Sequence, residues 1–151
     1  MLFRSDPLSS ECITILSISF AARMVPALRA VPWDLVVIDE AHKLRNAHRD
    51  SHRTGQAIKE AFAGCRKLLV TATPLQNSLI ELYGLSTILD EHLFGDRISF
   101  RSQFMRGDEA LPALRRRLEE FTRRTLRRQV LEYVQYTERK PVTFQIGRAH
   151  V

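Results

Sequence analysis

Long apolar runs and paired cysteines are both missing from this sequence of 151 residues. No run reaches the eighteen or more apolar residues that a membrane-spanning helix requires, so none is predicted. The two cysteines, Cys12 and Cys65, lie far apart, and neither belongs to a C-x-x-C pair. We therefore expect two reduced thiols in a cytosolic protein.

A phosphate-binding P-loop is missing as well. Such a loop has the pattern G-x-x-x-x-G-K-[ST], because its backbone amides and its lysine hold the phosphates of a nucleotide. None of the six glycines precedes a lysine; they stand at positions 55, 64, 84, 95, 107 and 147. These residues alone therefore supply no phosphate cradle of this type.

The composition indicates a globular domain with a basic surface. It is 44% hydrophobic and 26% charged, and its length suits one ordinary domain. Lysine and arginine outnumber aspartate and glutamate by 23 to 17, which gives a formal net charge of +6. This charge favours anionic partners such as nucleic acid or a nucleotide.

Apolar, β-branched runs alternate with helical patterns along the chain. We predict buried strands over residues 12–19, 34–39 and 67–73, the second buried on both faces of a sheet. Helices are expected over residues 56–64, 78–89 and 109–124, with a polar loop over 42–55. Ser78-x-x-Glu81 has the pattern of a capping box. This alternation predicts an α/β domain with a mostly parallel sheet flanked by helices.

Two acids, Asp39 and Glu40, follow the apolar run of the second predicted strand. Ligands of open parallel sheets bind beyond the carboxyl ends of the strands. Mg²⁺ prefers oxygen ligands and needs only one or two carboxylates, while a neighbouring acid can orient or deprotonate an attacking water. The alternative is that both are ordinary loop acids at a strand end.

A second stretch, "LLVTATPLQN" (Leu68 to Asn77), also runs from an apolar strand into small hydroxyl residues. The hydroxyls of Thr71 and Thr73, at the end of a neighbouring strand, could hydrogen-bond His42 and so sense a nucleotide site. The alternative is a turn in which threonine and proline only shape the loop.

Together these two stretches resemble a known family. "DEAH" resembles motif II (Walker B) of superfamily-two helicases, and "TATPLQN" resembles their motif III. The longer strings "WDLVVIDEAHKLRN" and "TATPLQNSLIELYGLSTIL" resemble the Swi/Snf-related DNA-dependent ATPases, in their bacterial branch. "RTLRRQVLEYVQYTERKP" resembles the stretch in which that family leaves its first motor lobe. The resemblance implies a partial RecA-like domain of the P-loop NTPase type.

The resemblance also implies roles for particular residues. Asp39 would hold Mg²⁺ through water and Glu40 would be the general base, both in a site for ATP. His42, Thr71 and Thr73 would couple the nucleotide state to DNA contact. Arg127 and Arg128 match paired arginines of the family and are candidates for DNA binding. Gln76 and Asn77 match motif III, but the sequence assigns them no chemistry.

The protein implied is a bacterial, cytoplasmic, nucleoid-associated ATPase that moves on double-stranded DNA or remodels bound proteins. A second motor lobe would lie elsewhere in the parent chain, and without it and the P-loop this fragment would be inactive. Two alternatives stay open. One is another superfamily-two enzyme, such as a restriction-type translocase or a true helicase, and the other is a non-catalytic DNA- or protein-binding module that retains the motor fold.

Other charged clusters carry weaker hypotheses. Three histidines, at positions 42, 48 and 52, lack the third well-spaced ligand of a zinc site. The arginines at 115–117, 123 and 124 could follow a DNA backbone. Because Glu119 and Glu120 lie among them, a solvated helix face is the better interpretation.

The two ends of the sequence resemble sequencing adapters. "LFRS" (Leu2 to Ser5) back-translates as CTC TTC CGA TCT, and "IGRAHV" (Ile146 to Val151) as ATC GGA AGA GCA CAC GTC. We therefore expect residues 1–5 and 146–151 to be adapter-derived, residues 6–137 to be the C-terminal part of the first lobe, and residues 138–145 to lead toward the missing second lobe. Different codons at both ends of the nucleotide sequence would contradict this expectation.

Overall fold

The structure is a computed structural model that describes residue 8, residues 13–107 and residues 109–125. The chain divides into two units, residues 1–114 and 115–151. The described elements, in order, are α1 (Ile18–Ala21), α2 (Val25–Arg29), β1 (Val36–Ile38), the 3₁₀ helix η1 (Ala41–Leu44), α3 (Arg53–Ala61), β2 (Lys67–Leu69), α4 (Leu79–Leu89), α5 (Arg97–Phe104) and α6 (Ala110–Glu119). None of the described helices is long and apolar enough to cross a membrane.

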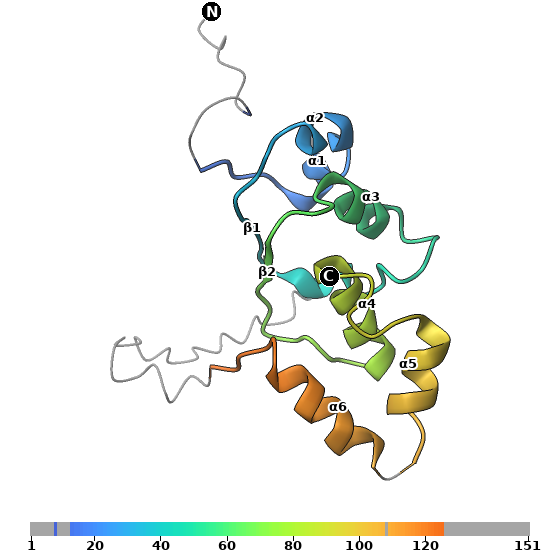
Figure 1. The fold of residues 1–151 in the computed structure, drawn as a ribbon. Coiled ribbons are helices and arrows are strands. Elements are labelled where there is room, and N and C mark those ends of the chain that lie inside the picture. Colours follow the sequence, from blue (N-terminus) through green and yellow to red (C-terminus); the bar gives the residue numbers. More distant parts are fainter. Residues whose placement is uncertain (1–7, 9–12, 108, 126–151) are drawn as a thin grey trace, which may run out of the picture. The chain divides into compact units, whose positions relative to one another are not determined.

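The sheet of the first unit is parallel, as predicted. β1 and β2 pair in the register Val36 with Lys67, Val37 with Leu68, and Ile38 with Leu69. α3 connects them, so the three elements form a β-α-β unit (Figure 1). A parallel pair requires such a crossover, because the chain must return to the same end of the sheet. The predicted fold class, an α/β arrangement with a parallel sheet, is confirmed.

The strand predicted over residues 12–19 is absent from the described part of the chain. Residues 13–17 belong to no strand, and α1 begins at Ile18. The Ser17 side chain accepts a hydrogen bond from the N–H of Phe20 at 3.1 Å, which caps a helix where the apolar pattern favoured a strand. Ile13 and Ile15 are 91% and 90% exposed, whereas Leu16 and Ile18 are partly buried against the core.

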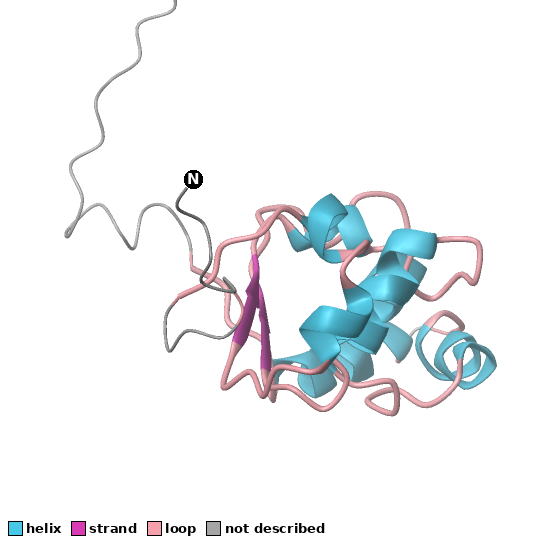
Figure 2. Cartoon of the chain, turned by 90° about the horizontal axis from the view of Figure 1, so that it is seen from above, coloured by secondary structure: helices cyan, strands magenta, loops and turns pink. Residues whose placement is uncertain are grey.

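Burial on both faces of β1 was also a wrong prediction for the described residues. The helices of the first unit lie on one side of the two strands (Figure 2). Ile38 belongs to the core cluster and is buried, whereas the neighbouring Val37 and its partner Leu68 are about half exposed, at 55% and 50%. Successive side chains of a strand point to opposite faces, so cover on one side protects only every second residue.

The core forms between the sheet and the helices. α3 contributes the buried residues Ile58 and Ala61, and Phe62 at its C-cap is buried as well. Trp33 packs edge-on against Phe62, with ring centroids 6.2 Å apart, and its Nε1–H donates to the carbonyl of Leu28 at 2.8 Å. The main cluster has these buried members: Ala21, Leu28, Ile38, Ala41, Leu44, Ala47, Ile58, Ala61, Phe62, Leu85 and Ile88.

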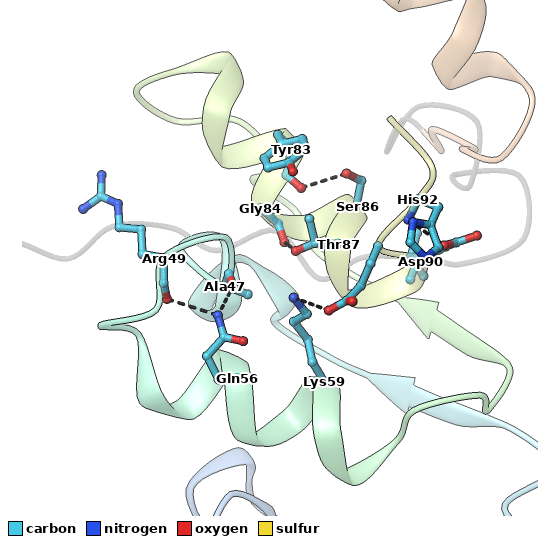
Figure 3. Close-up of polar contacts among 12 residues, drawn as sticks. Ala47, Arg49, Gln56, Lys59, Tyr83, Gly84, Ser86, Thr87, Asp90 and His92 are labelled. Atoms are coloured by element: carbon cyan, nitrogen blue, oxygen red, sulfur yellow. Dashed lines mark hydrogen bonds and ion pairs between the residues drawn. The ribbon is translucent and has the colours of Figure 1, made fainter. Parts of the chain in front are cut away.

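Polar contacts tie α3 to its neighbours on both sides (Figure 3). The Gln56 side-chain amide donates to the carbonyls of Ala47, at 2.8 Å, and Arg49, at 3.2 Å. Lys59 pairs with Glu91, just beyond α4, at 2.6 Å. The segment over 42–55 that was predicted to be a loop is therefore well anchored, and it contains most of η1 and the start of α3.

Gly84 brings α4 into direct contact with the segment that follows β1. A Cβ atom at this position would collide with the backbone carbonyl oxygen of Arg45 and would lie 2.7 Å from Nδ1 of His48. Glycine inside a helix costs about 1 kcal/mol relative to alanine. Only glycine leaves room for the Arg45 carbonyl. The lower helix propensity of glycine is therefore the cost of bringing the two segments into contact.

We expect Gly84→Ala to destabilise the fold. Overpacking costs roughly 1–3 kcal/mol, which outweighs the gain of about 1 kcal/mol in helix propensity. Urea denaturation would measure the free energy of unfolding. The comparison variant is Gly64→Ala, where φ is +76° but nothing lies within 4 Å of the added Cβ, so only backbone strain is tested. A Gly84→Ala protein as stable as the unmodified chain would show that the close approach is unimportant.

Candidate active site

The residues that follow β1 and β2 lie together at the carboxyl end of the sheet. Beyond the paired strands, the N–H of Val70 donates to the carbonyl of Ile38 at 2.9 Å, and the N–H of Ala41 donates to the carbonyl of Val70 at 3.0 Å. These bonds fasten the segment after β2 to the turn that carries Asp39 and Glu40. Segments about thirty residues apart in sequence thus meet where a parallel sheet binds its ligands.

Asp39 and Glu40 both expose their side chains to solvent. Glu40 has left-handed backbone angles, φ 52° and ψ 40°, and its N–H donates to Oδ1 of Asp39 at 2.8 Å. A residue with a Cβ atom pays about 1–2 kcal/mol for this conformation. The turn ends the strand, and η1 starts at Ala41. Both carboxylates therefore lie at the carboxyl end of the sheet and outside the core.

His42 links the acids to the segment after β2. Its Nδ1 lies 3.1 Å from Oε2 of Glu40 and 3.3 Å from Oγ1 of Thr71. A proton on Nδ1 suits both neighbours, because a carboxylate accepts hydrogen bonds and a hydroxyl oxygen can accept one. The structure thus brings together three of the predicted site residues.

Thr73 was expected to contact His42 through its hydroxyl, but it contacts Thr71 through its backbone instead. Its backbone N–H donates to Oγ1 of Thr71 at 3.2 Å, and its side chain is exposed. Thr71 therefore has contacts with both His42 and Thr73, and the connection from Thr73 to His42 runs through the hydroxyl of Thr71.

Two residues that sequence reasoning did not assign to the site contact the motif directly. Glu81 and Arg45 bind the backbone and side chains of Gln76 and Asn77. The sequence signal for Glu81 was present, because it stands three residues after Ser78, but that spacing predicted a helix cap. Ser78 does cap α4, through a 3.4 Å bond from the N–H of Ile80, whereas Glu81 bonds residues further upstream.

Asp39 and Glu40 could serve a metal ion that needs few protein ligands. In the described ranges, no group of three or more histidine, cysteine, aspartate or glutamate residues could hold an ion. Mg²⁺ commonly keeps several waters and takes one or two carboxylates besides substrate phosphates. Two exposed carboxylates at a strand end fit that requirement.

His48 and His52, the other two histidines considered as zinc ligands, make contacts that stabilise the fold. Nδ1 of His52 accepts the N–H of Gly55 at 3.1 Å and caps α3. His48 packs against Tyr83, with ring centroids 6.1 Å apart. Burial lowers the pKa of His48, and the nearby Arg49 and Arg97 charges lower it further, while the nearby backbone of Arg45 acts in the opposite direction. His48 therefore belongs to the packing between the post-β1 segment and α4.

The arginines of α6 belong to the second unit, which begins at Arg115, and they make local pairs. Nε of Arg115 lies 3.4 Å from Glu119, and Nη1 of Arg117 lies 2.9 Å from Glu120, at spacings of four and three residues. These are the contacts of a solvated helix face. The predicted DNA-binding pair, Arg127 and Arg128, lies outside the described residues, as do the predicted connector and both predicted adapter-derived ends.

The sequence matches the SNF2-related domain over residues 6–143. The chain therefore belongs to this family, whose members are helicase-like ATPases of superfamily two with a RecA-like fold. The partial RecA-like domain expected from the sequence is thereby confirmed, and the small parallel sheet with its helices is consistent with part of such a domain.

Relatives of this chain occur in bacteria and eukaryotes. It is 30% identical over 106 residues to an uncharacterized ATP-dependent helicase, YqhH, of Bacillus subtilis, covering 68% of this chain and 18% of the relative. It is 34% identical to the ISWI chromatin-remodeling complex ATPase ISW1 of Saccharomyces cerevisiae, covering 61% and 8%. For the human lymphoid-specific helicase the identity is 36%, covering 67% and 12%.

The chain thus spans less than a fifth of the length of each of these relatives. No solved structure matches it significantly.

Proposed function

We propose that this chain is the C-terminal part of the first motor lobe of a DNA-dependent ATPase. The parent would couple ATP hydrolysis to movement on double-stranded DNA or to the remodelling of proteins bound there, in the cytoplasm of a bacterium. One observation carries the proposal: His42 lies between the Glu40 carboxylate at the end of β1 and the Thr71 hydroxyl after β2. Membership of the SNF2-related family supports it.

In this proposal the two acids divide the chemistry. Asp39 would hold Mg²⁺ through water, and the ion would neutralise charge on the ATP phosphates when bound. Glu40 would orient the attacking water and take its proton. Its exposed carboxylate at the sheet edge is suited to both tasks, and the contact with His42 holds it there.

His42, Thr71 and Thr73 would transmit the state of the nucleotide site to the DNA-binding surface. The Thr71 hydroxyl touches the same imidazole nitrogen as Glu40, so a displacement of the segment after β2 changes the surroundings of the proposed base. Arg127 and Arg128 would contact the DNA backbone, for which positive charge is sufficient.

The 151-residue chain alone is expected to hydrolyse no ATP. Phosphoryl transfer depends on positioned positive charge around the phosphates, and the chain has no P-loop to supply its share. Phosphate release from the purified chain, measured with and without double-stranded DNA, should equal that of buffer. DNA-stimulated release above this background would contradict the proposal that hydrolysis requires a P-loop that this chain lacks.

Glu40→Gln should abolish hydrolysis in a longer chain that also carries the P-loop and the second lobe. Loss of a general base lowers turnover by roughly 10²–10⁴-fold. The affinity for ATP, measured with a fluorescent analogue, should change by less than about twofold, since the amide occupies the same space without the charge that takes the proton. Glu60→Gln is the matched control, because Glu60 is an exposed acid on α3 that pairs with Arg29 at 3.6 Å. Turnover that survived Glu40→Gln would exclude Glu40 as the base.

A further inference from the structure

We propose that Glu81 and Arg45 are positioning residues, which clasp the segment Thr71–Asn77 to α4 and to the end of η1. This clasp would keep Thr71 and Thr73 in place beside His42, and it gives Gln76 and Asn77 a role that the sequence did not. The inference rests on the proposed ATPase function and deepens it.

Apolar burial does not hold the segment Thr71–Asn77. Residues 72–77 are all exposed, and the segment has neither helix nor strand structure. At its start it is held by the strand pairing, through the bond from Val70 to Ile38. Its far end therefore depends on polar contacts.

The Glu81 carboxylate provides most of these contacts. One oxygen accepts the backbone N–H groups of Gln76, at 3.1 Å, and Asn77, at 3.2 Å. The other accepts the side-chain amide of Asn77 at 3.0 Å. Glu81 is only 7% exposed, so its charge is shielded from water and depends on these donors.

The protonation state of Glu81 agrees with this role. Burial by itself raises the pKa of the carboxyl group. The hydrogen bonds from Asn77 and Gln76, together with the Arg45 charge, outweigh burial and leave the pKa below its usual value. The carboxylate is therefore ionised at neutral pH, in the form that accepts all of these bonds.

Arg45 connects the same carboxylate to η1. Its Nε lies 3.7 Å from Oε1 of Glu81, and its Nη1 donates to Oε1 of Gln76 at 2.6 Å. The backbone of Arg45 is fixed as well, because its carbonyl packs against Gly84, one helical turn beyond Glu81 on α4. One guanidinium thus joins the segment after β1, the segment after β2 and α4.

The consequence for the site follows from where the clasp lies. The segment is fixed at Val70 by the sheet and at Gln76 and Asn77 by the clasp, and the two threonines lie between these points. Releasing the far end would loosen the bond from Thr73 to Thr71, and with it the position of the Thr71 hydroxyl at His42. Glu81 and Arg45 would then affect turnover without touching the nucleotide.

The first experiment measures amide hydrogen exchange in the 151-residue chain. Glu81→Gln keeps the shape of the side chain but removes its charge, so the amides of Gln76 and Asn77 should exchange roughly tenfold faster. Glu91→Gln is the matched control, since it removes an acid paired with Lys59 at 2.6 Å outside the clasp. These two amides should keep their rates in the control.

Equal exchange rates at Gln76 and Asn77 in Glu81→Gln and the unmodified chain would overturn the clasp. If Glu81→Gln does not fold, Arg45→Met is the second variant, because it removes the Gln76 bond and the charge while keeping an apolar stem. Unchanged exchange in that folded variant would likewise contradict the proposal.

The second experiment uses the longer chain with the P-loop and the second lobe. Arg45→Met should lower kcat of DNA-stimulated hydrolysis roughly tenfold, with KM for ATP within about twofold, because the residue acts through the segment Thr71–Asn77 and not on the nucleotide. Arg45→Lys should restore part of kcat, since an ammonium group can still pair with Glu81. Equal kcat in Arg45→Met and unmodified protein would exclude a positioning role.

The two proposals fail separately. Hydrolysis that persists in Glu40→Gln contradicts the assignment of the base, whatever the exchange rates are. A Glu40→Gln protein without activity, combined with unchanged kcat in Arg45→Met, contradicts only the positioning role of the clasp.

Discussion

The parallel pairing of β1 with β2 is the constraint on which the rest of the site depends. Because the two strands run in the same direction, their carboxyl ends lie together, and the bonds Val70 to Ile38 and Ala41 to Val70 continue the pairing past the last strand residues. Without this register Thr71 would not reach His42. α3 supports this pairing, because its buried residues Ile58 and Ala61 share the core cluster with Ile38 of β1 and the helix returns the chain to the amino end of the sheet.

α4 is the second organising element, and it acts through two positions one turn apart. At Gly84 the missing side chain lets the Arg45 carbonyl approach the helix. At Glu81 a buried carboxylate accepts hydrogen bonds from the segment after β2. One face of the helix therefore provides both the close packing and the buried acceptor for these hydrogen bonds. A carboxylate with so little exposure to water is stabilised by its hydrogen-bond donors, and through them it contacts an exposed segment that buries almost no apolar surface.

Local patterns predicted the elements whose stability is local. The α4 helix and the strand before Asp39 form where periodicity and capping residues predicted them, whereas α3 begins at Arg53, three residues before its predicted start. The prediction over residues 12–19 was wrong because a β-branched run is compatible with a strand only where a partner pairs with it, and Ser17 starts a helix instead. The capping-box pattern at Ser78 and Glu81 was half right, since the helix cap forms but the acid serves a longer-range purpose.

The sequence by itself determined the family, the α/β class, the candidate acids Asp39 and Glu40, and the absence of a P-loop in these residues, because motifs and spacing are properties of the chain order. Tertiary structure alone decided which hydroxyl meets His42, and it joined Arg45 to both Gln76 and Glu81. Those contacts connect residues about thirty or more positions apart, through a left-handed turn at Glu40 and a close approach at Gly84. The physical reason is that such distances depend on strand register and helix packing, which no local pattern specifies.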